Sequence, residues 1–149
     1  MQTSGSLFRV LVATDLSECS HQAVRAALMV AERSPNAELV ILHVMDSSEP
    51  AEHVAAIEEK EKMGTTLVDE ITTLRGGVPI PSHVRVHYHV VRGVAAHTIV
   101  AEAASHQSDL VVVGTHGRRG IERMVLGSVA EMVVRLSPCS VLTIKQKSA

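Results

Sequence analysis

The sequence is poor in aromatic residues, with one Phe, one Tyr and no Trp among 149 residues. The core must therefore be built from aliphatic side chains and methionine, and the chain offers no aromatic platform for stacking the bases of single-stranded nucleic acid. The formal net charge is only −2, so no strong basic field favours DNA, RNA or an acidic membrane surface. We expect neither a nucleic-acid partner nor a membrane partner.

Cysteines and long apolar runs are also scarce. Cys19 and Cys139 are the only cysteines, and two thiols outside any C-x-x-C pair indicate small apolar residues rather than a disulfide framework. No apolar run reaches the length of a membrane span. Arg9 interrupts the first apolar run, which argues against a secretory signal there. These absences predict a cytoplasmic protein.

The chain alternates short apolar, β-branched segments with amphipathic ones. Strands are predicted over residues 7–14, 37–45, 84–91, 110–113 and 140–145, and helices over 17–31, over 54–74 with a break or bend at Gly64, over 93–106 and from Gly127 onward. Such alternation favours right-handed βαβ crossovers and a parallel sheet covered on both faces. Because there is no repeat or linker, residues 1–149 are predicted to form one three-layer, doubly wound α/β domain with five mostly parallel strands.

The segment from Asp109 to Glu131 has the features of a phosphate site. A buried strand ends on Gly114, a basic loop with two more glycines follows, and Gly127-Ser128 opens a segment with helical apolar spacing. Glycine backbone can approach an anion closely, and the first N–H groups of a helix favour negative charge. The same residues also fit a tight turn followed by a helix cap without a ligand.

The spacing differs from both common phosphate motifs, because neither G-x-x-x-x-G-K-[ST] nor G-x-G-x-x-G occurs. Instead, Gly114-x-x-Gly117 is followed after nine intervening residues by Gly127-Ser128. Together with the opening V-L-V-A-T-D and the closing S-V-L-T-I-K, this pattern resembles the universal stress protein family, in its ATP-binding branch, over essentially the whole chain. The resemblance implies a Rossmann-like sheet with the strand order 3-2-1-4-5.

The resemblance also implies a role for each matching position. An acidic residue at Asp15 lies beside the nucleoside, and the backbone at Val44 meets the adenine. Gly114 and Gly117 approach the ribose and the first phosphate, while the start of the last helix cradles the phosphates. The predicted nucleotide site comprises Ala13, Thr14, Asp15, Val44, Val113, Gly114, His116, Gly117, Arg118, Gly127, Ser128 and Val129. Its ligand is ATP, or ADP or AMP, with Mg²⁺ carried by the nucleotide's own phosphates.

Several of these residues also have simpler explanations. Asp15 is suited to capping a turn, as Asp often does after strands. Arg118 and Arg119 suit phosphate geometry, but they fit equally well as solvated loop charges. His116 fits an ordinary surface loop as well as a place near the phosphates.

Nine histidines raise the question of a metal site. His87 and His89 share one face of the third strand, because side chains two apart point the same way. No cysteine, and no acidic residue close in sequence, completes a recognisable tetrahedral set. We therefore expect surface or inter-element histidines and no metal held by the protein itself.

The predicted function is that of an adenine-nucleotide-binding regulatory protein of the stress response, acting as a nucleotide-dependent switch with slow or no hydrolysis. Arginines near the phosphates can stabilise charge, but no carboxylate or glutamine is fixed on an attacking water, although Glu122 and Glu131 lie nearby in sequence. Two alternatives are open. One is a nucleotide-independent interaction module, and the other is a weak ATPase or nucleotidyl transferase on the same scaffold.

The last strand begins at Ser140 and ends at Lys145, and it lies at a sheet edge if the family's strand order applies. An apolar edge strand presents unpaired backbone groups that a partner can cover. The resemblance implies that this partner is a second copy related by a two-fold axis, so a homodimer is expected. Lys145 and Lys147 offer the alternative of an edge protected by charge.

Overall fold

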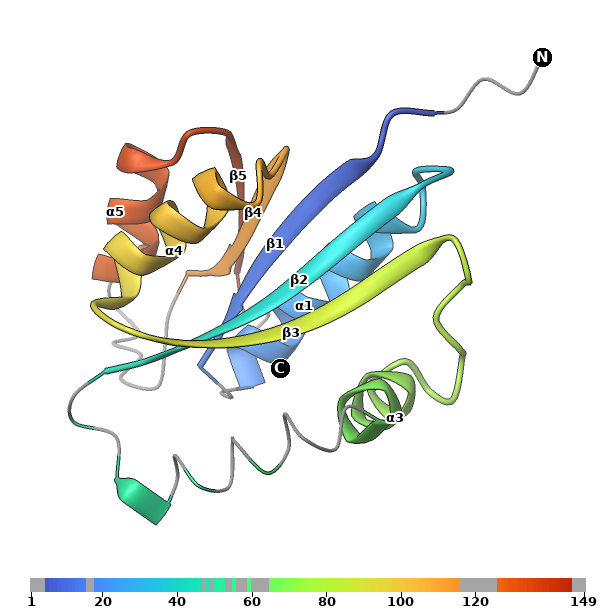
Figure 1. The fold of residues 1–149 in the computed structure, drawn as a ribbon, viewed down its shortest axis with the longest axis horizontal. Coiled ribbons are helices and arrows are strands. Elements are labelled where there is room, and N and C mark those ends of the chain that lie inside the picture. The colour runs from blue at the N-terminus through green and yellow to red at the C-terminus, as the bar shows by residue number, and fades with distance from the viewer. Residues whose placement is uncertain are drawn as a thin grey trace.

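The structure, a computed structural model, describes residues 5–15, 18–46, 48, 50–52, 55, 59, 65–115 and 126–145. Its centre is a sheet in the order β3-β2-β1-β4-β5, with every adjacent pair parallel (Figure 1). The strands are β1 (Phe8–Thr14), β2 (Ala37–Met45), β3 (Val84–Arg92), β4 (Leu110–Gly114) and β5 (Ser140–Ile144). The doubly wound α/β fold and the strand order 3-2-1-4-5 are thereby confirmed.

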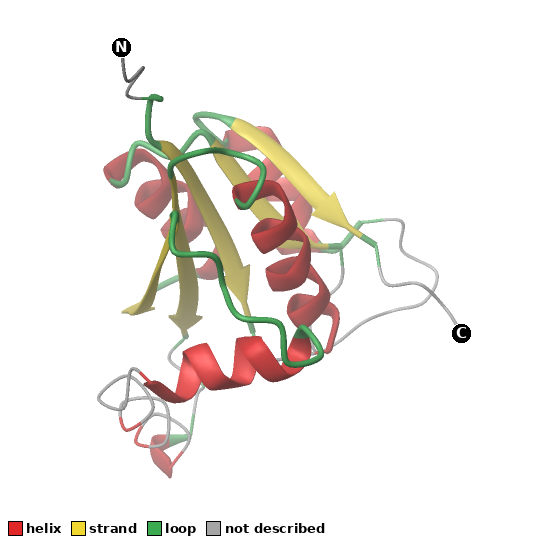
Figure 2. Cartoon of the chain, turned by 90° about the vertical axis from the view of Figure 1, so that its right-hand side faces the viewer, coloured by secondary structure: helices red, strands yellow, loops and turns green. Residues whose placement is uncertain are grey.

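Helices cover both faces of this sheet (Figure 2). One face carries α1 (Glu18–Ala31) and α3 (Thr65–Leu74), and the other carries α4 (Ala95–Ser105) and α5 (Ser128–Leu136). Successive strand residues point to opposite faces. Val10 and Val12 therefore join the cluster under α1, whereas Leu11 joins the cluster under α4 and α5. Three layers result, with two cores separated by the sheet.

Both cores are aliphatic, as the composition requires. β2 is buried along most of its length, and alanines on the buried faces of α1 and α4 let these helices approach the sheet closely. Phe8 and Tyr88 only pack against the edge of the cluster on the α1 side. Cys139 is a free, half-buried thiol beside the other cluster. No helix in the described part of the chain is both long and apolar enough to cross a membrane.

The observed boundaries agree with the predicted ones to within about two residues, except in one segment. The helix predicted over 54–74 is described as a regular helix only from Thr65, and Gly64 lies outside the described residues. The helix predicted from Gly93 begins at Ala95 instead. Gly93 is held in the preceding turn because its N–H donates to the carbonyl of Met45, at 3.0 Å.

The turn after α3 requires two glycines. Gly76 and Gly77 have φ of 71° and 84°, a left-handed conformation that glycine adopts without steric cost. A Cβ placed at either position would meet no heavy atom within 4 Å. A side chain at either position would therefore cost free energy only through the backbone conformation and not through a clash with neighbouring atoms.

Replacing Gly77 with Ala is expected to destabilise the fold by about 1 kcal/mol. A left-handed backbone costs an L residue about 1–2 kcal/mol. Alanine also lowers the conformational entropy of the unfolded chain, which offsets part of that cost. Thermal unfolding should show a Tm lower by roughly 2–4 °C for a chain of this size. Val78→Ala, in the exposed neighbouring position, is the matched control and should change little. Equal Tm values for Gly77→Ala and the wild type would contradict the expectation.

Candidate functional site

At the carboxyl ends of β1 and β4, the connecting helices switch from one face of the sheet to the other. The connections after β1 and β2 contain α1 and α3 on one face, while those before β4 and β5 contain α4 and α5 on the other. The paired residues of β1 and β4 are only 10–12 and 110–112, although each strand continues for two more residues. The two strands therefore separate toward their carboxyl ends, which is where open α/β sheets bind ligands.

The structure places the predicted strand-end residues around this separation. They are Ala13 and Thr14 at the end of β1, Asp15 directly after it, Val44 near the end of β2, and Val113 and Gly114 at the end of β4. Val113 is buried, and the side chain of Val44 packs against the cluster under α4 and α5. At both positions only the backbone remains for a ligand.

A hydrogen-bonded joint brings the two halves of the glycine pattern together. The N–H of Gly127 donates to the carbonyl of Thr115 at 2.6 Å, and the N–H of Thr115 donates to the carbonyl of Ile144 at 3.0 Å. Gly127 is thereby held beside the end of β4, next to Gly114 in space although far from it in sequence. The first and last glycines of the pattern thus meet at the point where β1 and β4 separate.

The first turn of α5 is open at this joint. Gly127 is the N-cap, with φ −69° and ψ 160° and no side-chain hydrogen bond to the helix. This is extended backbone that any residue adopts, so the local conformation does not explain the glycine. Ser128 and Val129 are exposed, and the first N–H groups of a helix have no acceptor within it. The turn is therefore suited to receiving an anion at close range.

Part of the predicted site lies outside the described residues. His116, Gly117 and Arg118 belong to this part, together with Arg119 and Glu122. Their roles at the phosphates stay predictions.

A buried histidine that the sequence analysis did not single out fixes the ends of β1 and β2. His43 is 1% exposed, and its Nδ1 lies 2.9 Å from the carbonyl oxygen of Thr14. Because a carbonyl only accepts, Nδ1 carries the proton, and Nε2 has no hydrogen-bond partner within the described residues. The hydroxyl of Thr14 meets that of Ser20 on α1 at 3.0 Å. The Thr14 side chain is therefore directed toward α1, and only the backbone of Thr14 lies at the strand ends.

The histidine pair on β3 lies as predicted, but one of the two has partners that the sequence did not indicate. His87 is 3.9 Å from Glu38 (Nε2 to Oε2). His89 instead meets Glu102 of α4 and His106, the C-cap residue of that helix. These partners come from a different element than His89. Their proximity to His89 therefore depends on the packing of α4 against the sheet.

Comparison with known proteins gives a consistent result. The model of the universal stress protein family matches residues 7–145. A universal stress protein of Methanocaldococcus jannaschii is 33% identical over 141 residues, covering 93% of this chain and 82% of that protein. A universal stress protein A homologue of Coxiella burnetii is 33% identical over 143 residues, covering 93% and 96%.

Solved structures agree with the fold. The universal stress protein UspA from Lactobacillus plantarum superposes with a TM-score of 0.72 at 24% identity, covering 92% of this chain and 97% of that one. A universal stress protein solved in complex with cAMP gives a TM-score of 0.62 at 28% identity, covering 92% and 95%.

Proposed function

Because the chain belongs to the universal stress protein family, we propose that it binds an adenine nucleotide, ATP or its products ADP or AMP, and acts as a nucleotide-dependent switch in a stress response. The observation that carries the proposal is the joint between Thr115 and Gly127, which holds both ends of the glycine pattern at the separating strands. The relative solved with cAMP supports an adenine nucleotide as the class of ligand.

The proposed ligand spans from β2 to α5. The adenine lies against the backbone at Val44, the ribose lies near Asp15 and Gly114, and the phosphates lie at the first turn of α5. Each of these positions is at the carboxyl end of its strand or at the start of the helix that follows. Phosphates at α5 gain from the N–H groups and dipole of the helix, and Mg²⁺ accompanies them as a phosphate-bound ion.

Hydrolysis is proposed to be slow or negligible. A fast ATPase needs a group that positions or deprotonates the attacking water. Glu131 is the acidic residue in the first turn of α5, but its Oε1 accepts from Arg135 Nη2 at 3.1 Å, one turn further along the helix. That contact directs the carboxylate along the helix surface. Slow turnover suits a switch, because binding and release rather than chemistry then set the state of the protein.

Native mass spectrometry of the purified chain tests the nucleotide proposal directly. We expect a retained adenine nucleotide or, after removal of nucleotide, saturable binding of Mg-ATP. At a hundredfold excess over Kd, binding should raise the Tm by roughly 5–10 °C. Mg-GTP at the same concentration is the control for base selectivity. A chain that carries no nucleotide and gives no shift with Mg-ATP contradicts the proposal and favours the interaction module.

The proposed assembly is a homodimer through β5. This strand pairs only with β4 in the described sheet, and its residues from Val141 onward are only half-buried. Beside it, α5 exposes Val129, Met132, Val134 and Leu136, each 39–49% accessible. An edge strand next to apolar side chains is a surface that a second copy can cover.

A further inference from the structure

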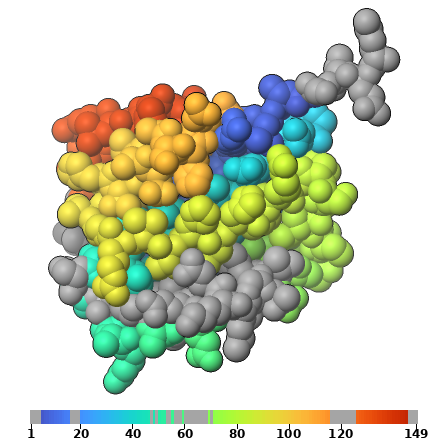
Figure 3. Space-filling view, in the orientation of Figure 1, coloured from blue at the N-terminus to red at the C-terminus, as the bar shows by residue number. Residues whose placement is uncertain are grey.

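Three potential metal ligands meet between β3 and the C-terminal end of α4. They are His89 of β3, Glu102 of α4 and His106, the C-cap residue of that helix, and one ligand atom from each lies within 4.8 Å of the other two. Glu102 Oε2 is already 3.3 Å from His106 Nε2. The rings of His89 and His106 meet edge to face, with centroids 5.1 Å apart. Figure 3 shows β3 and α4 side by side on the same face of the molecule.

We propose that His89, Glu102 and His106 bind one divalent transition-metal ion per chain, with Zn²⁺ as the best match. Two imidazole nitrogens and one carboxylate oxygen form a borderline donor set that suits Zn²⁺. Three protein ligands leave the fourth tetrahedral position open to water. Mg²⁺ prefers oxygen ligands in octahedral geometry, so it does not suit this set.

The distances allow such a site with small side-chain movements. Bonds of about 2.0–2.1 Å in a tetrahedral site place neighbouring ligand atoms roughly 3.3 Å apart. Glu102 and His106 already have that separation, because residues four apart lie on the same face of a helix. His89 has to close by about 1.5 Å at most, which a rotation of its ring can supply.

Burial also favours a site over an ordinary surface contact. The side chains of Glu102 and His106 are only 24% and 23% exposed, and His89 is half-buried between the strand and the helix. A simple Glu–His contact on a helix surface would not account for a second, half-buried imidazole beside it. A cation at this point links β3, the edge strand, to α4, and such a link stabilises the folded chain by mass action.

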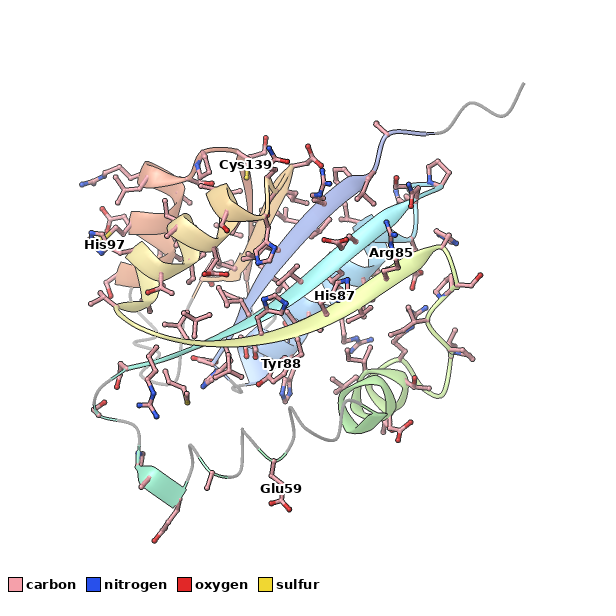
Figure 4. The ribbon with its side chains drawn as sticks, viewed as in Figure 1. Glu59, Arg85, His87, Tyr88, His97 and Cys139 are labelled. Atoms are coloured by element: carbon pink, nitrogen blue, oxygen red, sulfur yellow. The ribbon has the colours of Figure 1, made fainter. Side chains whose placement is uncertain are left out.

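The neighbouring histidines provide matched controls. His87 lies on the same face of β3, but it is 48% exposed and pairs with Glu38. His97 lies on α4 itself, at the edge of the molecule away from His87 (Figure 4). Each control removes one imidazole from the same elements and keeps the three proposed ligands. His97 is the stricter control, because the His87 ring lies edge-on to that of His89, with centroids 6.5 Å apart.

Isothermal titration of the nucleotide-free, tag-free full chain with ZnCl2 tests the proposal. We expect one Zn²⁺ per chain, weakened at least about tenfold by His106→Gln or His89→Gln. His97→Gln and His87→Gln should bind like the wild type, and MgCl2 should give no saturable signal. A Co²⁺-loaded chain should show the visible absorption of a tetrahedral ion, and His106→Gln should lose it.

Three outcomes would overturn the site. The first is equal Zn²⁺ affinity for the wild type and both ligand variants. The second is an equal loss in the control variants, which would indicate diffuse surface binding. The third is one Zn²⁺ per two chains, which would place the ion between molecules. If His106→Gln fails to fold, His89→Gln still tests the site, because this substitution leaves the helix unchanged. Nucleotide binding is measured separately with Mg-ATP, so neither result depends on the other.

Discussion

Gly127→Val is expected to weaken Mg-ATP binding by at least about tenfold while leaving the apo protein folded. Gly127 has extended backbone, with φ −69° and ψ 160°, which suits a β-branched residue. The isopropyl group would stand at the mouth of the first turn of α5, where the proposed phosphates approach the N–H groups. Each hydrogen bond to a charged group contributes about 1.5–3 kcal/mol, so losing one or two corresponds to a factor of about 10–10⁴.

The test compares binding with stability in the same set of variants. Titration calorimetry with Mg-ATP gives the affinity, and thermal unfolding without nucleotide shows whether the joint to Thr115 survives. Gly127→Ala should give an intermediate loss of affinity, because its side chain is smaller. Val134→Thr, an isosteric change at an exposed position of the same helix, should bind like the wild type. Unchanged affinity in Gly127→Val would place the phosphates elsewhere and remove the main support for the proposed site.

The sequence predicted most of the fold because the periodic patterns are strong. β2 is apolar along nearly its whole length and is buried on both faces, and α5 begins at the residue after the predicted glycine cap. The strand order did not follow from these patterns. Periodicity identifies a strand but says nothing about its neighbours, so the order came from the family resemblance and was confirmed by the pairing.

Part of the chemistry was not visible in the sequence, for two physical reasons. His43 stands in an apolar strand, and no local pattern shows that its ring turns to the carbonyl of the adjacent strand. Glu102 and His106 have helical spacing to each other, but their proximity to His89 arises only when α4 packs on the sheet. Sites at strand ends are predictable because parallel strands end together, whereas sites between elements require the packed structure.

Thr143→Pro is expected to convert the proposed dimer into a monomer with little loss of stability. The carbonyl of Ile144 accepts from Thr115, so the backbone groups of Ile144 face the β4 side. N–H and C=O groups alternate in direction along a strand. Those of Thr143 therefore face the open edge, where a second copy of β5 would pair. Proline at this position removes the outward donor and places its ring against an incoming strand.

Leu142→Pro is the contrasting variant, because the backbone of Leu142 faces β4 and its loss breaks the ladder within the chain. We expect Thr143→Pro to be a monomer in analytical ultracentrifugation. Its Tm should be close to that of the wild type diluted until the dimer dissociates, whereas Leu142→Pro should unfold at a clearly lower temperature. A Thr143→Pro protein that remains dimeric at micromolar concentration excludes pairing through β5. The exposed apolar side chains of α5 would then become the candidate interface, and Met132→Lys would test it. The two surfaces are thus separable, because one depends on backbone groups and the other on side chains.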